Sequence, residues 1–152
     1  MRVTEDRADG QEEDVLGQFF AASVEDVDDV LVEEGPYGRL SIVEAKGLTE
    51  VSLATLGEIL GVGGYDQLVE RIGEGPQAES EEAGVLTIPT QLRDVLAEAR
   101  DINTVAAGWA ATDELSLDGW RIEDSLRVLR ELSALAREAA ANGRELWYWW
   151  SL

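Results

Sequence analysis

The segment ELWYWWSL, residues 145–152, constrains the fold more than any other because it places four aromatic residues in consecutive positions. Such residues have high β-propensity, which predicts a strand over residues 144–152. Successive side chains of a strand point to opposite faces, which here gives Leu146, Tyr148, Trp150 and Leu152 on one face and Trp147, Trp149 and Ser151 on the other. Both faces are apolar. We therefore predict that this strand pairs with GQFFAA (residues 17–22) inside a small sheet covered by helices.

An alternative interpretation leaves part of this strand open to solvent. In that case Trp147 and Trp149 form an aromatic platform for a ligand or partner, on a face of the sheet that the helices leave uncovered. The burial of these two indole rings distinguishes the two interpretations.

The rest of the chain shows mainly the patterns of short helices. Residues 1–14 predict a disordered acidic tail, and residues 15–152 a single globular α+β domain with a surface loop over 73–84. Ser23 followed by Asp26 has the spacing of a helix start, so residues 24–34 predict a helix with Val24, Val27, Val30 and Leu31 facing inward. Residues 37–47 suit either a second strand or a loop. Further helices are predicted over residues 51–60, 90–100, 102–115 and 120–143, with a brief unassigned segment at 65–72.

These elements predict an α+β fold that is mostly helical, with a small sheet that includes the first apolar segment and the C-terminal strand. The 152 residues, of which 45% are hydrophobic, are sufficient to bury one core. No apolar run has the length of a signal peptide or a membrane span. A cytoplasmic location is therefore expected.

The net charge of −20 is unevenly distributed along the chain. Residues 1–34 carry twelve acids and two arginines, whereas residues 83–152 carry eleven acids and seven arginines. A negative field repels nucleic acid and anionic membranes and favours a cationic partner, although it also serves solubility alone. Direct binding to nucleic acid or membrane is therefore not expected, while mimicry of DNA stays open.

The absence of certain residue types limits which catalytic and metal-binding sites this chain can form. Without cysteine or histidine, Ser-His-Asp and Cys-His catalysis and Cys- or His-based metal sites have no ligands or bases. The acids at residues 25–29 do not have the spacing of a calcium loop, and GVGGYD (residues 61–66) does not have that of a dinucleotide loop. Asp113 and Glu114, near Trp109 and Trp120, form the best local carboxylate cluster for glycoside hydrolysis, but a helix end explains them as well. No catalytic residue, metal or cofactor is predicted.

Several segments in order resemble the YfbM-like domains, a family of unknown function. The resemblance lies in FFAASVEDVDDVL (19–31), EAKGLTEVSLATLGEILG (44–61), TQLRDVLAEA (90–99) and AREAAANGRELWYWW (136–150). The chain departs from the pattern at residues 73–86 and by carrying tryptophans where such domains commonly carry smaller aliphatic residues. The resemblance implies an α+β fold and no established activity.

Three hypotheses for function follow. The first is a non-enzymatic protein-binding module, such as an immunity or inhibitor protein, that covers a basic toxin or nuclease with Glu25, Asp26, Asp28, Asp29, Glu33 and Glu34. The second is a small ligand-binding domain or enzyme with a concave site that contains Trp109, Trp120 or Trp149. The third is a structural or oligomeric domain whose acids serve solubility. The first is preferred because of the charge asymmetry and the absence of catalytic residue types.

Overall fold

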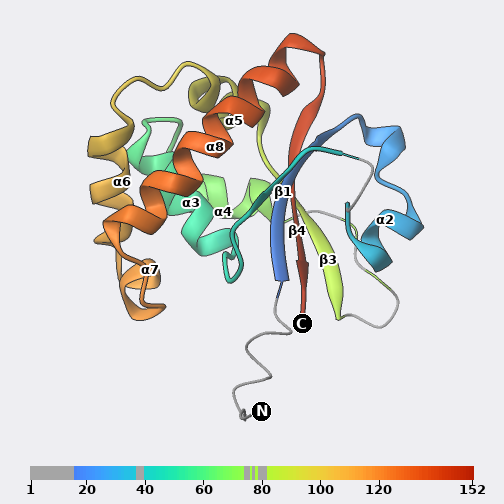
Figure 1. Ribbon diagram of the computed structural model, residues 1–152, viewed down its shortest axis with the longest axis horizontal. Coiled ribbons are helices and arrows are strands. Elements are labelled where there is room, and N and C mark those ends of the chain that lie inside the picture. Colours follow the sequence, from blue (N-terminus) through green and yellow to red (C-terminus); the bar gives the residue numbers. More distant parts are fainter. Residues whose placement is uncertain (1–15, 37–39, 74–75, 77, 79–81) are drawn as a thin grey trace.

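The computed structural model describes residues 16–36, 40–73, 76, 78 and 82–152. These residues form an α+β fold in which a four-stranded antiparallel sheet separates a thick layer of helices from one short helix (Figure 1). This confirms the predicted fold class. The predicted tail over residues 1–14 lies outside the described residues, as does part of the predicted loop over 73–84. In the described part of the chain, no helix has both the length and the apolar character that a membrane crossing requires.

The last strand in the sequence lies inside the sheet. The strand order is β2-β1-β4-β3, with β1 at Leu16–Ala22, β2 at Ile42–Glu44, β3 at Ala83–Thr87 and β4 at Glu145–Ser151. Strand β4 pairs along its whole length with β1, from Leu16 opposite Ser151 to Ala22 opposite Glu145. The predicted pairing of the final strand with GQFFAA is therefore correct. Both edges of β4 are therefore paired, and because β4 carries apolar side chains on both faces, each face of the sheet needs a cover.

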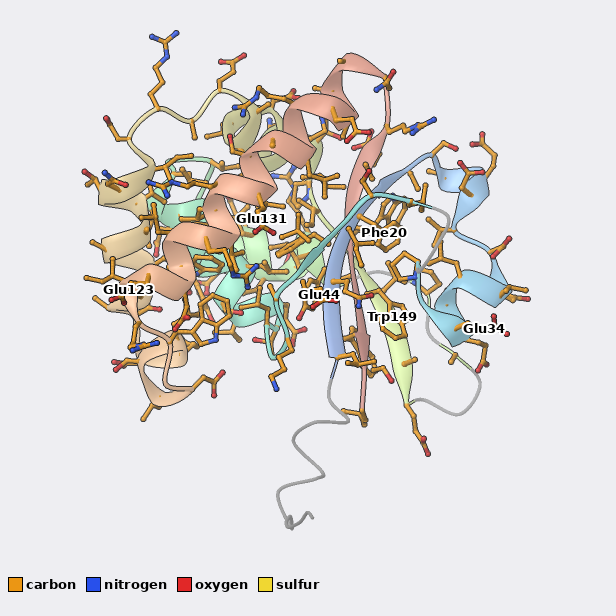
Figure 2. All side chains as sticks on the ribbon, viewed as in Figure 1. Phe20, Glu34, Glu44, Glu123, Glu131 and Trp149 are labelled. Atoms are coloured by element: carbon orange, nitrogen blue, oxygen red, sulfur yellow. The ribbon has the colours of Figure 1, made fainter. Side chains whose placement is uncertain are left out.

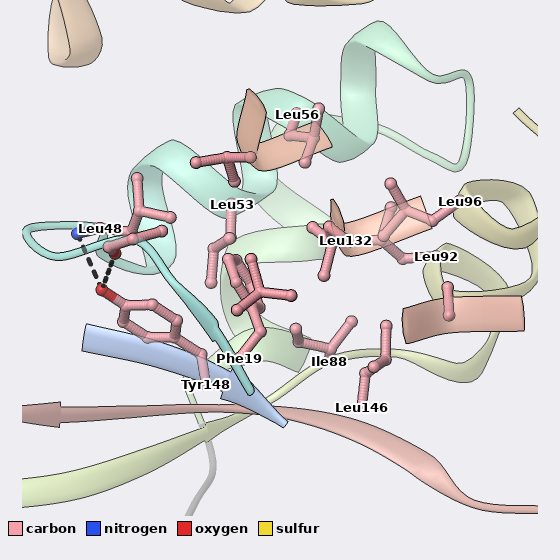
Figure 3. Packing of buried hydrophobic residues seen from close by; sticks show 14 of the residues in the cluster. Phe19, Leu48, Leu53, Leu56, Ile88, Leu92, Leu96, Leu132, Leu146 and Tyr148 are labelled. Carbon is pink, nitrogen blue, oxygen red and sulfur yellow. Dashed lines mark hydrogen bonds between the residues drawn. The ribbon is translucent and has the colours of Figure 1, made fainter. Parts of the chain in front are cut away.

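The larger core lies between the sheet and the layer of helices. Phe19, Leu146 and Tyr148 point into it from the strands and are fully buried (Figure 3). The helices that enclose it are α3 (Glu50–Ile59), α4 (Tyr65–Ile72), α5 (Thr90–Ala97), α6 (Ile102–Ala110), α7 (Asp113–Leu117) and α8 (Ile122–Ala141). The longest helix, α8, packs along α5 and α6 and presents its apolar stripe to the sheet.

A smaller core lies on the opposite face of the sheet. Phe20, Trp147 and Trp149 point to this side, where the short helix α2 (Asp29–Glu34) covers them with Leu31 and Val32 (Figure 2). Alternation along β4 thus sends Leu146 and Tyr148 into one core and Trp147 and Trp149 into the other, as the sequence pattern predicts.

The structure corrects two predicted helices and adds one strand. The predicted helix over residues 24–34 is divided into a 3-10 turn, η1 (Val24–Asp26), and α2, because the Asp28 side chain starts a new helix by accepting a hydrogen bond from the Leu31 N–H at 2.9 Å. The predicted helix over residues 102–115 is likewise divided, into α6 and α7. Strand β3 was not predicted at all. The open choice at residues 37–47 is resolved in part, since Ile42–Glu44 form the edge strand β2.

Candidate functional site

The six carboxylates that the sequence analysis singled out lie together on the segment of residues 23–35, which we call the acidic segment. It consists of η1, α2 and their connection, and it contains six acids and no lysine or arginine. All six side chains are exposed: Glu25, Asp26, Asp28, Asp29, Glu33 and Glu34. Figure 2 shows Glu34 pointing away from the sheet at the outer side of α2. The structure therefore brings the predicted partner-binding residues onto one solvent-facing surface.

Two valines of the acidic segment are also exposed. Val24 is 67% and Val30 56% accessible, although the sequence analysis predicted that both point inward. The prediction was wrong because the break at Val27 and Asp28 changes the rotation of the chain, so that Leu31 and Val32 become the buried residues of α2. The surface therefore combines exposed carboxylates with exposed apolar side chains.

Two tryptophans of β4 connect the acidic segment and the residue before it to the sheet. The indole N–H of Trp149 donates a hydrogen bond to the Val32 carbonyl at 2.8 Å, and the indole N–H of Trp147 donates one to the Ala22 carbonyl at 2.9 Å. Leu31 and Val32 fill the space above these rings. One of these hydrogen bonds thus reaches α2 itself and the other reaches the residue just before the acidic segment, so both attach this part of the chain to β4.

The same contacts show that Trp147 and Trp149 do not form an open platform. Their accessible fractions are 7% and 2%, and α2 lies over them. Trp109 is also fully buried, with its indole N–H donating to the Ser52 carbonyl at 3.0 Å. These three tryptophans are structural, since each packs in a core and has its polar atom paired with the backbone.

The two other tryptophans have a different environment. Trp120 and Trp150 are half-buried, and among the hydrogen bonds of the described residues none involves either indole N–H. Each of them lines a pocket. Sequence reasoning missed Trp150 as a candidate because strand alternation alone predicts burial at that position; only the register shows that it lies near the open end of the sheet.

The pocket beside Trp120 has a volume of about 510 Å³ and mixed charge. It lies between the start of β1, the chain after β2 and the start of α8. Its charged lining residues are Glu44, Lys46, Asp118, Asp124 and Arg127. Arg127 is held there, because its Nη2 donates to the Glu44 carbonyl at 3.0 Å and its Nη1 lies 3.4 Å from Glu131 Oε1. Nearby in β1, Gln18 is 2% accessible and its Oε1 has no hydrogen-bond partner.

The other residues that the sequence analysis considered for catalysis or ligand binding have structural explanations. Asp113 and Glu114 form the first turn of α7, where acids favour the helix dipole. Arg137 donates to Ser133 and to the Ala97 carbonyl, so it joins α8 to the end of α5. Within the ranges that the structure describes, no three acidic side chains are gathered closely enough to hold a metal ion.

The hydroxyl of Tyr148 has a shifted pKa, which its buried position explains. Its hydroxyl donates to the Ala45 carbonyl at 2.6 Å and accepts from the Leu48 N–H at 3.1 Å, as the dashed lines in Figure 3 show. Burial raises the pKa of this hydroxyl well above its ordinary value of 10.0, and the hydrogen bond from Leu48 opposes this rise only partly. Tyr148 therefore stays neutral and links β4 to the loop that precedes α3.

A scan against protein-family models, a search of curated proteins and a search of solved structures each found no match to this chain. The resemblance to YfbM-like domains stays a prediction. The described residues form an α+β domain with an acidic, partly apolar surface and with pockets lined by Trp120 and by Trp150, and function is argued from these features.

Proposed function

We propose that this chain is a protein-binding module whose acidic segment binds a basic partner protein. The observation that supports the proposal is that six exposed carboxylates and two exposed valines lie on one segment anchored to the sheet. An interface of this kind suits an inhibitor or immunity protein that covers the basic site of a toxin or nuclease.

The two kinds of side chain have different roles in this proposal. The carboxylates attract a cationic surface over distances of about 10 Å at moderate ionic strength and so accelerate association. Val24 and Val30 supply apolar area that is removed from water in the complex. The partner is therefore expected to present arginines or lysines around a small apolar spot.

Charge reversal on the acidic segment tests the proposal. We choose Glu25→Lys, Glu33→Lys and Glu34→Lys in one protein, because these exposed side chains leave the Asp28 helix cap intact and lysine is compatible with the C-terminal end of α2. The matched control reverses Glu70, Glu98 and Glu138, which are exposed on the helical layer. Both variants change the net charge by six, from −20 to −14.

The three proteins are used as bait in a lysate of the source cells, and bound proteins are quantified by mass spectrometry. We expect one basic protein to bind the unchanged chain and the control variant, and to be lost from the variant with the reversed acidic segment. Equal loss of the basic protein from both variants would show that net charge alone determines binding. Equal retention by all three proteins would refute the role of the acidic segment.

A second candidate function is the binding of a small ligand at the pocket beside Trp120. The observation in its favour is that Trp120 lines this pocket with groups of both charges, Lys46 and Arg127 together with Glu44, Asp118 and Asp124. Such a set suits a zwitterion, whose opposite charges each find a partner. Amide and indole NMR spectra recorded with free amino acids test it: a saturable shift of the Trp120 indole signal is expected, and unchanged spectra would remove the candidate.

A further inference from the structure

A second pocket, of about 610 Å³, opens between the end of β4 and the start of α3. Its volume lies within the range of about 300–1,000 Å³ that is typical of small-molecule sites. Leu48, Leu86, Trp150 and Leu152 give it an apolar lining, and Thr49 and Glu50 come from the start of α3. This pocket is separate from both the acidic segment and the charged lining of the Trp120 pocket.

Trp150 lines this pocket and packs against a glycine of the neighbouring strand β3. Gly17 of β1 and Gly84 of β3 are its register partners on either side. A Cβ atom at Gly84 would lie 2.7 Å from Cζ2 and 3.0 Å from Nε1 of Trp150, so the indole packs directly on the β3 backbone. The ring is thereby oriented without being fully buried, because it stays partly accessible while its neighbour Trp149 is 2% accessible.

Among the described residues that line this pocket, Glu50 alone has a charged side chain. It is the first residue of α3, where the capping box of Thr49 and Ser52 fixes the backbone, with the Thr49 N–H donating to Ser52 Oγ at 2.8 Å. No ion pair found among the described residues engages the Glu50 carboxylate. An apolar pocket with an aromatic wall and one carboxylate has the chemistry that recognises an organic cation.

We propose that this pocket binds a small organic cation with an apolar body. The ammonium group pairs with Glu50, and the apolar part packs on Trp150, Leu48 and Leu86. The net charge of −20 raises the local concentration of such cations and disfavours anions of the same shape. This inference does not depend on the protein-binding proposal, since the two rest on different residues.

The experiment compares three probes of one shape: 4-phenylbutylamine, which is cationic, 4-phenylbutan-1-ol, which is neutral, and 4-phenylbutyrate, which is anionic. Binding to the full chain is followed by NMR through the indole N–H signal of Trp150, assigned with Trp150→Phe, and the amide signals of Leu48, Ser151 and Gly73. We expect saturable shifts with the amine, binding about fivefold weaker with the alcohol, and no binding of the acid, as for a partly exposed ion pair beside an aromatic ring.

Two variants distinguish binding in this pocket from a general attraction of cations to an acidic protein. Glu50→Gln removes the carboxylate of the pocket, and Glu58→Gln removes an exposed carboxylate from the same helix outside it. Glu50→Gln is expected to weaken amine binding about fivefold, and Glu58→Gln to leave it unchanged. Equal effects of the two variants, equal binding of amine and acid, or shifts confined to the acidic segment would each overturn the proposal.

Discussion

The polar atoms of the buried aromatic residues are paired with backbone groups. The indole N–H groups of Trp109, Trp147 and Trp149 and the hydroxyl of Tyr148 each donate to a carbonyl between 2.6 and 3.0 Å away. Every one of these bonds joins residues far apart in the sequence. A buried polar atom without a partner costs free energy, so each of these bonds also favours one placement of a loop or helix over a strand.

Tyr148→Phe is expected to destabilise the fold by about 1–3 kcal/mol, because it leaves the Leu48 N–H and the Ala45 carbonyl without their buried partner. Urea unfolding at neutral pH measures this change. Tyr65→Phe, at a half-buried position on α4, is the control and should change the stability by less. Equal stability of wild type and Tyr148→Phe would show that the two hydrogen bonds contribute nothing.

The same hydroxyl predicts a dependence of stability on alkaline pH. Its folded-state pKa is raised above the unfolded value of about 10, so the native state holds the proton more tightly. The corresponding stability is fully present below pH 10 and is lost as the pH rises above it, at up to about 1.4 kcal/mol per pH unit. Unfolding measured between pH 8 and pH 11 should show a steeper fall for wild type than for Tyr148→Phe, and parallel curves would contradict the prediction.

Gly84→Ala tests the close approach of Trp150 to β3. The added Cβ would meet the indole ring at 2.7 Å, so we expect a loss of about 1–3 kcal/mol. In a Trp150→Leu background the same change should be less destabilising, since the ring is gone. Thermal unfolding of the four proteins of this cycle gives the coupling, and a coupling of zero would mean that the ring does not oppose the new methyl group.

At the scale of elements, the sequence predicted the strands that carry strong local signals and missed those defined by their neighbours. Strand β4 was predicted from its aromatic run, and α3 from its apolar spacing. Strand β3 was missed because AGVLT is short and contains Gly84, whose role becomes apparent only when Trp150 is paired beside it. The burial of Trp147 and Trp149 depends likewise on α2, a helix of six residues that alternation in β4 does not predict.

The break inside the acidic segment was missed for a related reason. The valines at 24, 27 and 30 have helical spacing, but Asp28 competes by capping the next turn through its side chain. Sequence reasoning therefore found the six exposed carboxylates correctly and assigned Val24 and Val30 to the wrong side. The Trp150 pocket was not predicted because it is formed by α3, β3 and β4 together.

Asp28→Ala is expected to destabilise α2 by about 1 kcal/mol, because the Leu31 N–H loses its acceptor. Asp28→Asn should retain most of the stability, since Asn is as good a helix cap. Loss of α2 also exposes Trp147 and Trp149, so tryptophan fluorescence should shift to the red in Asp28→Ala before global unfolding. A variant Asp28→Asn that is as unstable as Asp28→Ala would indicate that the charge of Asp28, not the cap, is the stabilising feature.

At the scale of the whole molecule, the net charge of −20 opposes the compact state through mutual repulsion. Sodium chloride should therefore stabilise the protein, by about 1–2 kcal/mol between 0.02 and 0.5 M, as the repulsion becomes screened. Denaturation in urea at each salt concentration measures this effect. The variant with Glu25, Glu33 and Glu34 reversed to lysine has a net charge of −14 and should respond less, whereas an equal response would assign the effect to ions bound elsewhere.

The position of β4 has a consequence for how the protein is made in the cell. Its residues are synthesised after β1, β2, β3 and the helices that the structure describes, yet β4 lies between β1 and β3 in the sheet, and Trp147 reaches Ala22 across 125 residues of sequence. A nascent chain on the ribosome can therefore form helices and the β1–β2 pair, but neither apolar face of the sheet is complete until the last strand emerges. Until then, the aromatic and aliphatic residues of the incomplete sheet stay accessible to chaperones that recognise such residues.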